Sequence, residues 1–255
     1  MAEDGTSAGT GAPRAQPNPG LPRAKLMERR GITEDLMVIK LEPEDGPLKF
    51  KPSQYCTLGL DGVERAYSIV SAPHEPLLEI FVELVPDGEL TPRMFRMQVG
   101  DWISIRPRAK GLFTMNQKVH HHFQVATVTG IAPYVSIIRD YLHGGSQGHK
   151  FYVLYGASYV DELTYDAELS KLAAEHPDVI QFIPTISRPS EERNAGWQGA
   201  QGRVNDIVEE YMAKFDLPQD DTMVYACGHP GMIEAVKEKF AAKGWKFKEE
   251  RFWKQ

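Results

Sequence analysis

The stretch Arg65-Ala66-Tyr67-Ser68, followed by Ile69-Val70-Ser71-Ala72-Pro73, places a cation, an aromatic ring and a hydroxyl on a predicted strand. Side chains alternate along a strand, so Arg65 and Tyr67 share one face while Ala66 and Ser68 share the other. A guanidinium can bind a pyrophosphate through two hydrogen bonds, and a phenol ring offers a flat surface to a planar heterocycle. The same residues also alternate on many solvated edge strands, so both interpretations stay open at this point.

The composition describes an ordinary soluble protein. The chain has 255 residues, of which 42% are hydrophobic and 25% charged, and it can bury one large core or two modest ones. It has no apolar run near 18 residues, and its N-terminus lacks the basic region and apolar core of a secretory signal. We therefore expect a cytoplasmic protein that does not bind a membrane. The net charge of −6 argues against a general nucleic-acid-binding protein.

The cysteines and histidines predict neither a disulfide nor a metal site. Cys56 and Cys227 are the two cysteines and lie far apart in the sequence, and two thiols cannot hold a four-cysteine iron–sulfur cluster. The adjacent histidines at 120–122 lack the i, i+4 spacing of helical metal ligands, so no metal is predicted. An iron–sulfur electron carrier would therefore be a separate protein.

Short strand-like segments dominate the first half of the chain. They cover 25–30, 35–41, 55–60, 65–71, 78–85 and 102–107. Strands at this spacing predict a closed antiparallel barrel of six strands. Within 35–41, Leu36, Val38 and Lys40 fall on one face. Residues 1–22 lack apolar periodicity and are expected to be a disordered tail, and residues 23–116 are expected to form the barrel domain.

The second half alternates strands and helices. Predicted strands at 123–128, 151–155, 179–184, 223–226 and 245–248 are separated by predicted helices at 133–141, 161–175, 204–215 and 230–243. This alternation predicts an α/β domain, residues 117–255, with a parallel sheet and helices on both faces. Nucleotides bind such sheets at the carboxyl ends of the strands. Residues 118–122 are expected to be a linker.

A helix-start signal interrupts the barrel. Thr91 is predicted as the N-cap, and Pro92 follows at the first helical position. A helix that begins there directs free N–H groups and its positive dipole end at whatever precedes it, and an anion is the natural ligand. A lid that closes the bottom of the barrel is equally compatible with the signal.

Three motifs in order carry a resemblance to a known family. They are RAYSIVSAP at 65–73, VPDGELTPRMF at 85–95 and GDWISI at 100–105, and they resemble the flavin domain of bacterial ferredoxin (flavodoxin) NADP reductases. The resemblance implies that Arg65 and Thr91 bind the FAD pyrophosphate and that Tyr67 packs on the isoalloxazine ring. It also implies that Ser68, which follows Ala66, bonds the reactive flavin nitrogen.

The resemblance implies an NADP site in the second half as well. The segment 127–133, TVTGIAP, resembles the family's TGTGIAP loop, in which Thr129 and Gly130 would approach the phosphates; Val128 stands where glycine is usual. Ordinary turn chemistry is the alternative interpretation.

The adenosine end of the nucleotide is assigned in the same way. Ser187, Arg188 and Arg203 would hold the 2′-phosphate, whereas Ser158 stands where some relatives carry a further arginine. Exposed loop charge is the alternative interpretation of both arginines.

Four residues near the ends of the last strands complete the site. By resemblance, Cys227 and the following Gly228 adjoin the nicotinamide, and Trp253 covers the flavin face opposite Tyr67. A buried structural thiol is the alternative for Cys227. Glu250 is a candidate proton relay, with a solvated carboxylate as the alternative.

The resemblance thus implies an FAD enzyme that takes hydride from NADPH and passes single electrons to ferredoxin or flavodoxin. From Lys237 to the end, seven Lys or Arg stand against three Glu, which predicts either a docking face for an acidic partner or a solvated helix face. An NADH-dependent reductase component of a multicomponent oxygenase and a flavin-binding sensor without turnover are the alternative functions.

Overall fold

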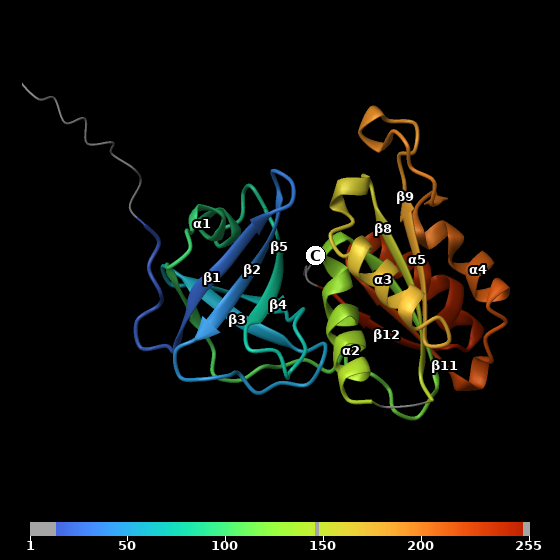
Figure 1. The fold of residues 1–255 in the computed structure, drawn as a ribbon, viewed down its shortest axis with the longest axis horizontal. Coiled ribbons are helices and arrows are strands. Elements are labelled where there is room, and N and C mark those ends of the chain that lie inside the picture. Colours follow the sequence, from blue (N-terminus) through green and yellow to red (C-terminus); the bar gives the residue numbers. More distant parts are fainter. Residues whose placement is uncertain (1–13, 146–147, 252–255) are drawn as a thin grey trace, which may run out of the picture.

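The structure is a computed structural model and describes residues 14–145 and 148–251, which form two domains side by side (Figure 1). The first is a β-barrel and the second a sheet covered by helices. Within the described residues, no helix combines the length and the apolar character needed to cross a membrane.

Six strands form the first domain. They are β1 (Arg23–Gly31), β2 (Leu36–Pro43), β3 (Tyr55–Leu60), β4 (Val63–Ser68), β5 (Leu78–Glu83) and β6 (Trp102–Ile105). They pair antiparallel in the order β4-β3-β6-β1-β2-β5. Just beyond β4, Ile69 pairs with Ile80 of β5, and the Val70 N–H donates to the Glu79 carbonyl at 2.8 Å. The two edges of the sheet therefore meet, and the predicted six-stranded antiparallel barrel is confirmed.

Strand β5 is buried on both faces. Its residues Leu78, Ile80 and Val82 point into the barrel core, as the period of two along a strand requires. The alternate residue Phe81 belongs instead to the core of the second domain, where its ring meets Tyr165 edge to face at 5.7 Å between centroids. The barrel is thus joined to its neighbour by the outer face of β5.

Strand β2 follows the same rule beside it. Met37, Ile39 and Leu41 fill the barrel, while Leu36 and Val38 pack against the second domain. The shared face predicted for Leu36 and Val38 is therefore confirmed, and it is an interdomain face.

Six parallel strands form the sheet of the second domain. They are β7 (His121–Thr127), β8 (Lys150–Ala157), β9 (Ile180–Ile186), β10 (Ala200–Gln201), β11 (Thr222–Cys227) and β12 (Lys246–Glu250), in the order β10-β9-β8-β7-β11-β12. The helices α2 (Ala132–His143) and α3 (Asp166–Glu175) pack with one core cluster, and α4 (Val204–Lys214) and α5 (Pro230–Phe240) with the other. Helices therefore cover both faces, and the predicted α/β class is confirmed (Figure 1).

The strand boundaries differ from the prediction where polar residues are buried. Strand β7 begins at His121, so the end of the predicted linker 118–122 is part of the sheet. His122 is fully buried, and both of its ring nitrogens have partners that offset the cost of burying them. One nitrogen lies 3.2 Å from the Tyr225 hydroxyl and the other 3.0 Å from His149 Nδ1. Helix α3 begins at Asp166 rather than 161, and the short strand β10 was not predicted.

Residues 14–22 are ordered against the barrel, in contrast to the predicted disordered tail. The Asn18 side chain is 8% exposed and accepts a hydrogen bond from the Gly62 N–H at 2.6 Å. The Gln16 N–H donates to Asp61 at 2.7 Å, and the Asp61 N–H donates back to the Gln16 carbonyl at 2.8 Å. The turn between β3 and β4 supplies these partners. Their hydrogen bonds hold the segment in place although it buries little apolar surface. Residues 1–13 lie outside the described residues.

One partly buried cation contacts three carboxylates across the domain boundary. Arg139 of α2 donates to Glu168 of α3 at 2.7 and 2.8 Å, to Glu79 of β5 at 3.1 Å and to Glu75 at 3.3 Å. The Arg139 side chain is 16% exposed and that of Glu79 is 10% exposed. Glu79 also accepts the Tyr165 hydroxyl at 2.7 Å.

Removing Arg139 should destabilise the two-domain unit. Arg139→Ala leaves Glu79 buried without its cation, and such a loss costs about 3 kcal/mol of unfolding free energy. Urea unfolding measures this value. Lys171→Ala is the matched control, because Lys171 forms an exposed pair with Glu175 at 3.8 Å and its loss should cost under about 0.5 kcal/mol. Equal effects of the two substitutions would show that the network does not hold the domains.

Candidate functional site

The site begins where the last residue of β4 meets the last residue of β12. The Ser68 hydroxyl donates to Glu250 Oε2 at 3.1 Å, which links the barrel to the parallel sheet. Glu250 lies opposite Cys227 in the pairing of β11 with β12, so both stand at the carboxyl ends of their strands. Figure 1 shows β12 running toward the barrel. The structure thus brings together Ser68, Cys227 and Glu250, three of the predicted site residues.

Glu250 is partly buried rather than a freely solvated carboxylate. Burial raises its pKa to about 7, and the hydrogen bond from Ser68 opposes that rise. Its carboxyl group therefore keeps its proton to a higher pH than a solvated glutamate does. A carboxyl group whose pKa lies near the working pH can serve either as a proton donor or as a proton acceptor.

Cys227 is fully buried in the core of the second domain. Burial, and then the nearby Glu250 carboxylate, raise the pKa of the Cys227 thiol well above its usual value. The thiol therefore stays protonated at neutral pH and is no thiolate nucleophile. In this structure Cys227 is therefore a buried thiol, as the alternative interpretation of the sequence describes it.

Two predicted glycines allow the ends of β7 and β11 to pack closely. A Cβ at Gly130 would overlap the Cys227 carbonyl oxygen, and a Cβ at Gly228, where φ is +125°, would overlap the Thr127 hydroxyl. The Thr127 hydroxyl also accepts the His229 N–H at 2.8 Å. Glycine is required at both positions because the two strand ends leave no room for a side chain.

An interdomain groove of about 440 Å³ opens beside the Ser68–Glu250 contact. Its walls are Tyr55, Gly111, Leu112 and Phe113 from the barrel and Lys248, Glu249 and Glu250 from β12. This volume falls within the range of small-molecule and cofactor pockets. The lining of the groove combines aromatic rings with the carboxyl group that Ser68 bonds, and these groups fit a flat ring with a polar edge such as a flavin.

The barrel residues of the opening motif sit at the surface of β4. Arg65 is exposed and pairs with Glu89 at 2.7 Å, Ala66 is exposed, and Tyr67 is half-buried against the barrel core. Burial raises the pKa of the Tyr67 phenol, which therefore stays neutral. An exposed ion pair contributes at most about 1 kcal/mol, so a phosphate can replace Glu89 on Arg65 at little cost.

Thr91 does not cap a helix as predicted. Helix α1 spans Thr91–Arg96, its N-cap residue is Leu90, and no side chain bonds there. The Thr91 hydroxyl instead accepts the Val85 N–H at 2.9 Å and donates to the Val85 carbonyl at 3.2 Å. The turn from 85 to 91 therefore uses both hydrogen-bonding functions of the hydroxyl.

The loop after β7 carries an unusual backbone. Thr129 and Gly130 lie in a short 3₁₀ turn, Val128–Ile131, that leads directly into α2. Val128 has φ of +41°, a conformation that β-branched residues rarely adopt and glycine adopts readily. Val128, which stands where the resembled family usually has glycine, is thus the one residue of this turn whose backbone conformation favours glycine.

The predicted adenosine residues lie at neighbouring strand ends. Strands β9 and β10 pair at Thr185 and Ile186, so Ser187 and Arg203 follow the paired ends of the two strands. Arg188 is exposed and donates to the Tyr159 hydroxyl at 2.7 Å and to Glu191 at 3.5 Å. The structure therefore brings these residues to the carboxyl edge, with Glu191 already close to Arg188.

Some groups at the site were not singled out in the sequence. Tyr55 lines the groove and pairs with Ser68 across β3 and β4, so the register of the predicted hairpin could have found it. Glu83 faces the Thr129 turn from β5. Burial raises the pKa of Glu83, and the nearby Asp35 and Glu162 carboxylates add to the rise. The sequence signal that could have identified Glu83 is its place on a hydrophobic strand, at a position that points away from the barrel core.

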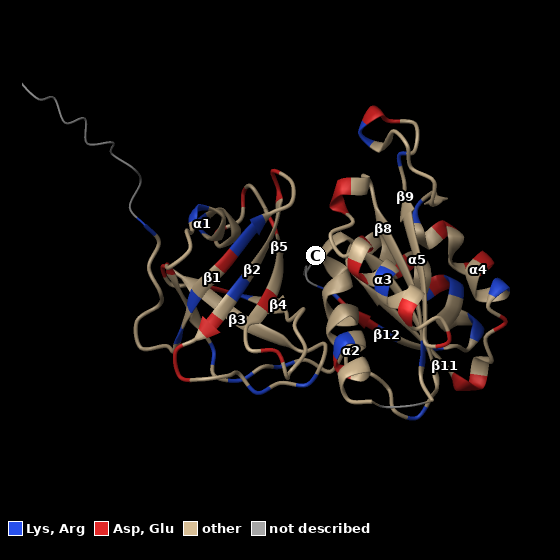
Figure 2. Cartoon of the chain, in the orientation of Figure 1, with Lys and Arg blue, Asp and Glu red and all other residues tan. Residues whose placement is uncertain are grey.

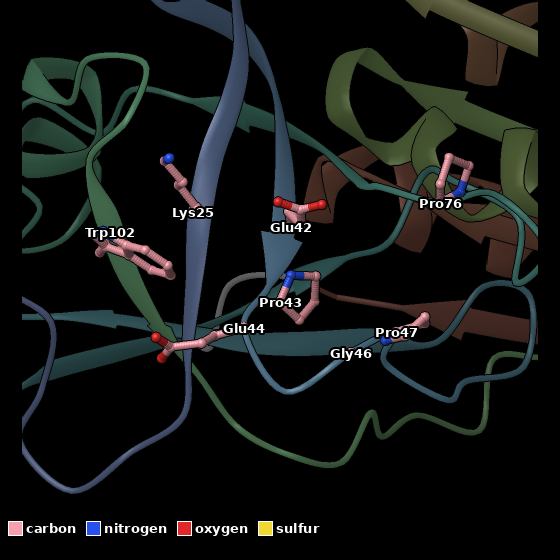
Figure 3. Close-up of a pocket in the computed structure, with 8 residues that line it drawn as sticks. All are labelled: Lys25, Glu42, Pro43, Glu44, Gly46, Pro47, Pro76 and Trp102. Carbon is pink, nitrogen blue, oxygen red and sulfur yellow. The ribbon is translucent and has the colours of Figure 1, made fainter.

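Trp253 lies outside the described residues. Among residues 14–145 and 148–251, no group of three or more His, Cys, Asp or Glu side chains is arranged to hold a metal ion. A second cavity, of about 510 Å³, lies on the barrel around Trp102, Lys25 and Glu42 (Figure 3), and none of the predicted site residues lines it.

Known proteins match both domains. The family model described as "Oxidoreductase FAD-binding domain" matches residues 23–113, and "Oxidoreductase NAD-binding domain" matches residues 125–238. A ferredoxin–NADP reductase of Pseudomonas aeruginosa is 32% identical over 212 residues, which cover 77% of this chain and 81% of that protein. A flavodoxin/ferredoxin–NADP reductase of Escherichia coli is 32% identical over 197 residues, 73% and 77% of the two chains.

A solved structure agrees in fold. A ferredoxin NADP+ reductase from Neisseria gonorrhoeae with bound FAD and NADP superimposes with a TM-score of 0.78 at 22% identity, over 91% of this chain and 98% of that one. The resemblance carried by the three barrel motifs is thereby confirmed. The chain belongs to the ferredoxin–NADP reductase family of oxidoreductases, with an FAD-binding and an NAD-binding domain.

Proposed function

We propose that this protein oxidises NADPH with FAD and delivers single electrons to a ferredoxin or flavodoxin. The observation that carries the proposal is the Ser68–Glu250 contact at 3.1 Å beside the interdomain groove. It unites the flavin motif of the barrel with the carboxyl edge of the nucleotide sheet. When bound, FAD supplies the conversion of a two-electron hydride into single-electron transfers.

The residues of the barrel and the last strands position the rings. Arg65 would bind the FAD pyrophosphate in place of Glu89, and Tyr67 would pack its phenol ring on the flavin. The small side chain of Ala66 lies on the other face of the strand. Trp253 covers the opposite flavin face. Thr91 contributes indirectly, because its hydroxyl fixes the turn from 85 to 91 beside the Arg65–Glu89 pair.

The residues of the sheet edge hold the nicotinamide and a proton. The nicotinamide would lie at the carboxyl end of β11 beside Gly228 and Cys227, whose neutral thiol is buried in this structure. Glu250 accepts or releases a proton at its carboxyl oxygen, and Ser68 donates its hydroxyl to that oxygen. Thr129 and Gly130 approach the nucleotide phosphates at the turn before α2.

The preference for NADPH rests on Ser187, Arg188 and Arg203. A 2′-phosphate can displace Glu191 from Arg188, because that ion pair is exposed and 3.5 Å long. The same pair favours a second candidate, an NADH-dependent reductase component of a multicomponent oxygenase, since Glu191 repels a phosphate and Ser158 supplies no further cation.

Anaerobic NADPH should bleach the yellow protein rapidly, because reduction removes the visible absorbance of a bound flavin. Absorbance near the flavin band in a stopped-flow experiment measures this, and denaturation should release one FAD per chain. A flavin that stays oxidised under NADPH would instead support a binding module without turnover.

Arg188→Ala should lower kcat/KM for NADPH by about 10- to 100-fold, since one charge-assisted hydrogen bond contributes about 1.5–3 kcal/mol. The value for NADH should not change. Steady-state kinetics with both nucleotides measures the ratio, and Glu191→Gln is the matched variant, which should lower the KM for NADPH. Wild-type preference for NADH, with neither KM altered by Arg188→Ala, would favour the oxygenase component.

Glu250→Gln should remove a pH dependence near pH 7. Because the folded-state pKa of Glu250 is raised from 4.5 to about 7, the folded protein binds the extra proton between these values, and stability falls as pH rises through that window. Turnover should show the same titration in the wild type and not in the variant. Thermal unfolding and NADPH oxidation from pH 5 to 8.5 measure both effects.

Glu249→Gln is the control for this experiment. Burial opposes ionisation of Glu249, but Arg251 and Lys237 bond its carboxylate and hold its pKa below the usual value. Its loss should leave the transition near pH 7 in place. A wild-type profile that is flat there would remove Glu250 from the proton path.

A further inference from the structure

Two loops of the barrel run side by side next to the interdomain groove. They are residues 47–54 and 106–118, called here the basic loop pair. The Tyr55 N–H donates to the Lys110 carbonyl at 2.8 Å and the Lys110 N–H donates back at 2.9 Å. The Ser53 hydroxyl donates to the Phe113 carbonyl at 2.6 Å. These bonds make the two loops one continuous surface.

This surface carries charge of a single sign. The two loops contain no Asp or Glu, and their cations are Lys49, Lys51, Arg106, Arg108, Lys110 and Lys118. Arg106 is neutralised by Glu64 at 2.6 Å. Within residues 14–145 and 148–251, the other five form no ion pair. A protein of net charge −6 thus concentrates free positive charge here, along the lower edge of the barrel in Figure 2.

An exposed apolar residue belongs to the same pair of loops. Leu112 is 91% exposed, the most exposed large hydrophobic side chain among the described residues. Leu112 also lines the interdomain groove, as Glu250 does. Protein interfaces commonly combine an apolar centre with a charged rim, and the rim charges steer the partner to the surface.

The C-terminal lysines are poorer candidates for docking, although their sequence suggested it. Lys237 pairs with Glu249 at 3.2 Å, and Lys239 and Lys243 pair with Glu209 at 3.7 and 2.6 Å. Arg251 pairs with Glu249 at 2.8 Å. Four of the C-terminal cations thus already have carboxylate partners, which favours the solvated helix face that the sequence also allowed.

We propose that the basic loop pair is the docking surface for an acidic electron-carrier protein, with Leu112 at the centre of the contact. This inference rests on the proposed function, because it places the carrier beside the flavin groove. Oxidation of one NADPH to NADP+ releases two electrons and one proton. Two carrier molecules therefore dock in turn, and each is reduced by one electron.

The double variant Lys51→Glu/Arg108→Glu tests the surface in the FAD-loaded enzyme, with an acidic bacterial flavodoxin as the probe. At low ionic strength we expect its KM for flavodoxin to rise at least tenfold. Added salt should weaken the wild-type interaction more than that of the variant, because salt screens the attraction. Both substituted side chains lie outside the groove lining, so NADPH oxidation with ferricyanide should be unchanged.

The double variant Lys239→Glu/Lys243→Glu is the control, since it reverses two charges on the C-terminal face. We expect it to leave the KM for flavodoxin within about twofold. A raised KM in this control together with a normal KM in the loop variant would overturn the docking surface alone. A wild-type enzyme that uses NADPH to reduce ferricyanide but cannot reduce the carrier would overturn both the docking surface and the proposed acceptor. An enzyme that does not oxidise NADPH at all would refute the proposed function itself.

Discussion

The burial of β5 on both faces is the constraint on which the rest of the structure depends. One face of the strand completes the barrel, and the other supplies Phe81 and Glu79 to the second domain. Phe81 packs on Tyr165, and Glu79 binds Arg139 and the Tyr165 hydroxyl. Interfaces between domains of one chain are often loose, but a strand that belongs to two cores cannot move relative to either without opening one of them.

This constraint fixes the distance across the functional site. The chain leaves β4 at Ser68, and the next residue, Ile69, pairs with Ile80 of β5. The Ser68 hydroxyl is therefore held one residue from the strand that joins the domains. Glu250 is held from the other side, since it pairs with Cys227 at the end of the parallel sheet. Two groups that are 182 residues apart in sequence can thus remain within 3.1 Å without a dedicated link.

The fold was largely predictable because it follows from periodicity, whereas several site details depend on partners distant in sequence. Strand alternation and strand–helix alternation predicted both sheets. The sequence could not show that His122 finds buried partners in Tyr225 and His149, or that the Thr91 hydroxyl is used by Val85. Glu250 is the clearest case: a charged residue near a terminus is normally solvated, but here burial in the folded protein raises its pKa.

In the turn after β7, close packing holds a residue in a backbone conformation that it would not adopt by itself. Val128 keeps a left-handed backbone at φ of +41°, which costs a β-branched residue roughly 1–3 kcal/mol. The turn cannot relax, because Gly130 lies against the Cys227 carbonyl and Gly228 lies against Thr127, and neither contact leaves room for a Cβ. The Val128 side chain also packs against the core of the second domain, which offsets part of the strain. Local rules are broken most often at functional sites, and this strained turn lies at the carboxyl edge of the parallel sheet, the edge at which such sheets bind nucleotides.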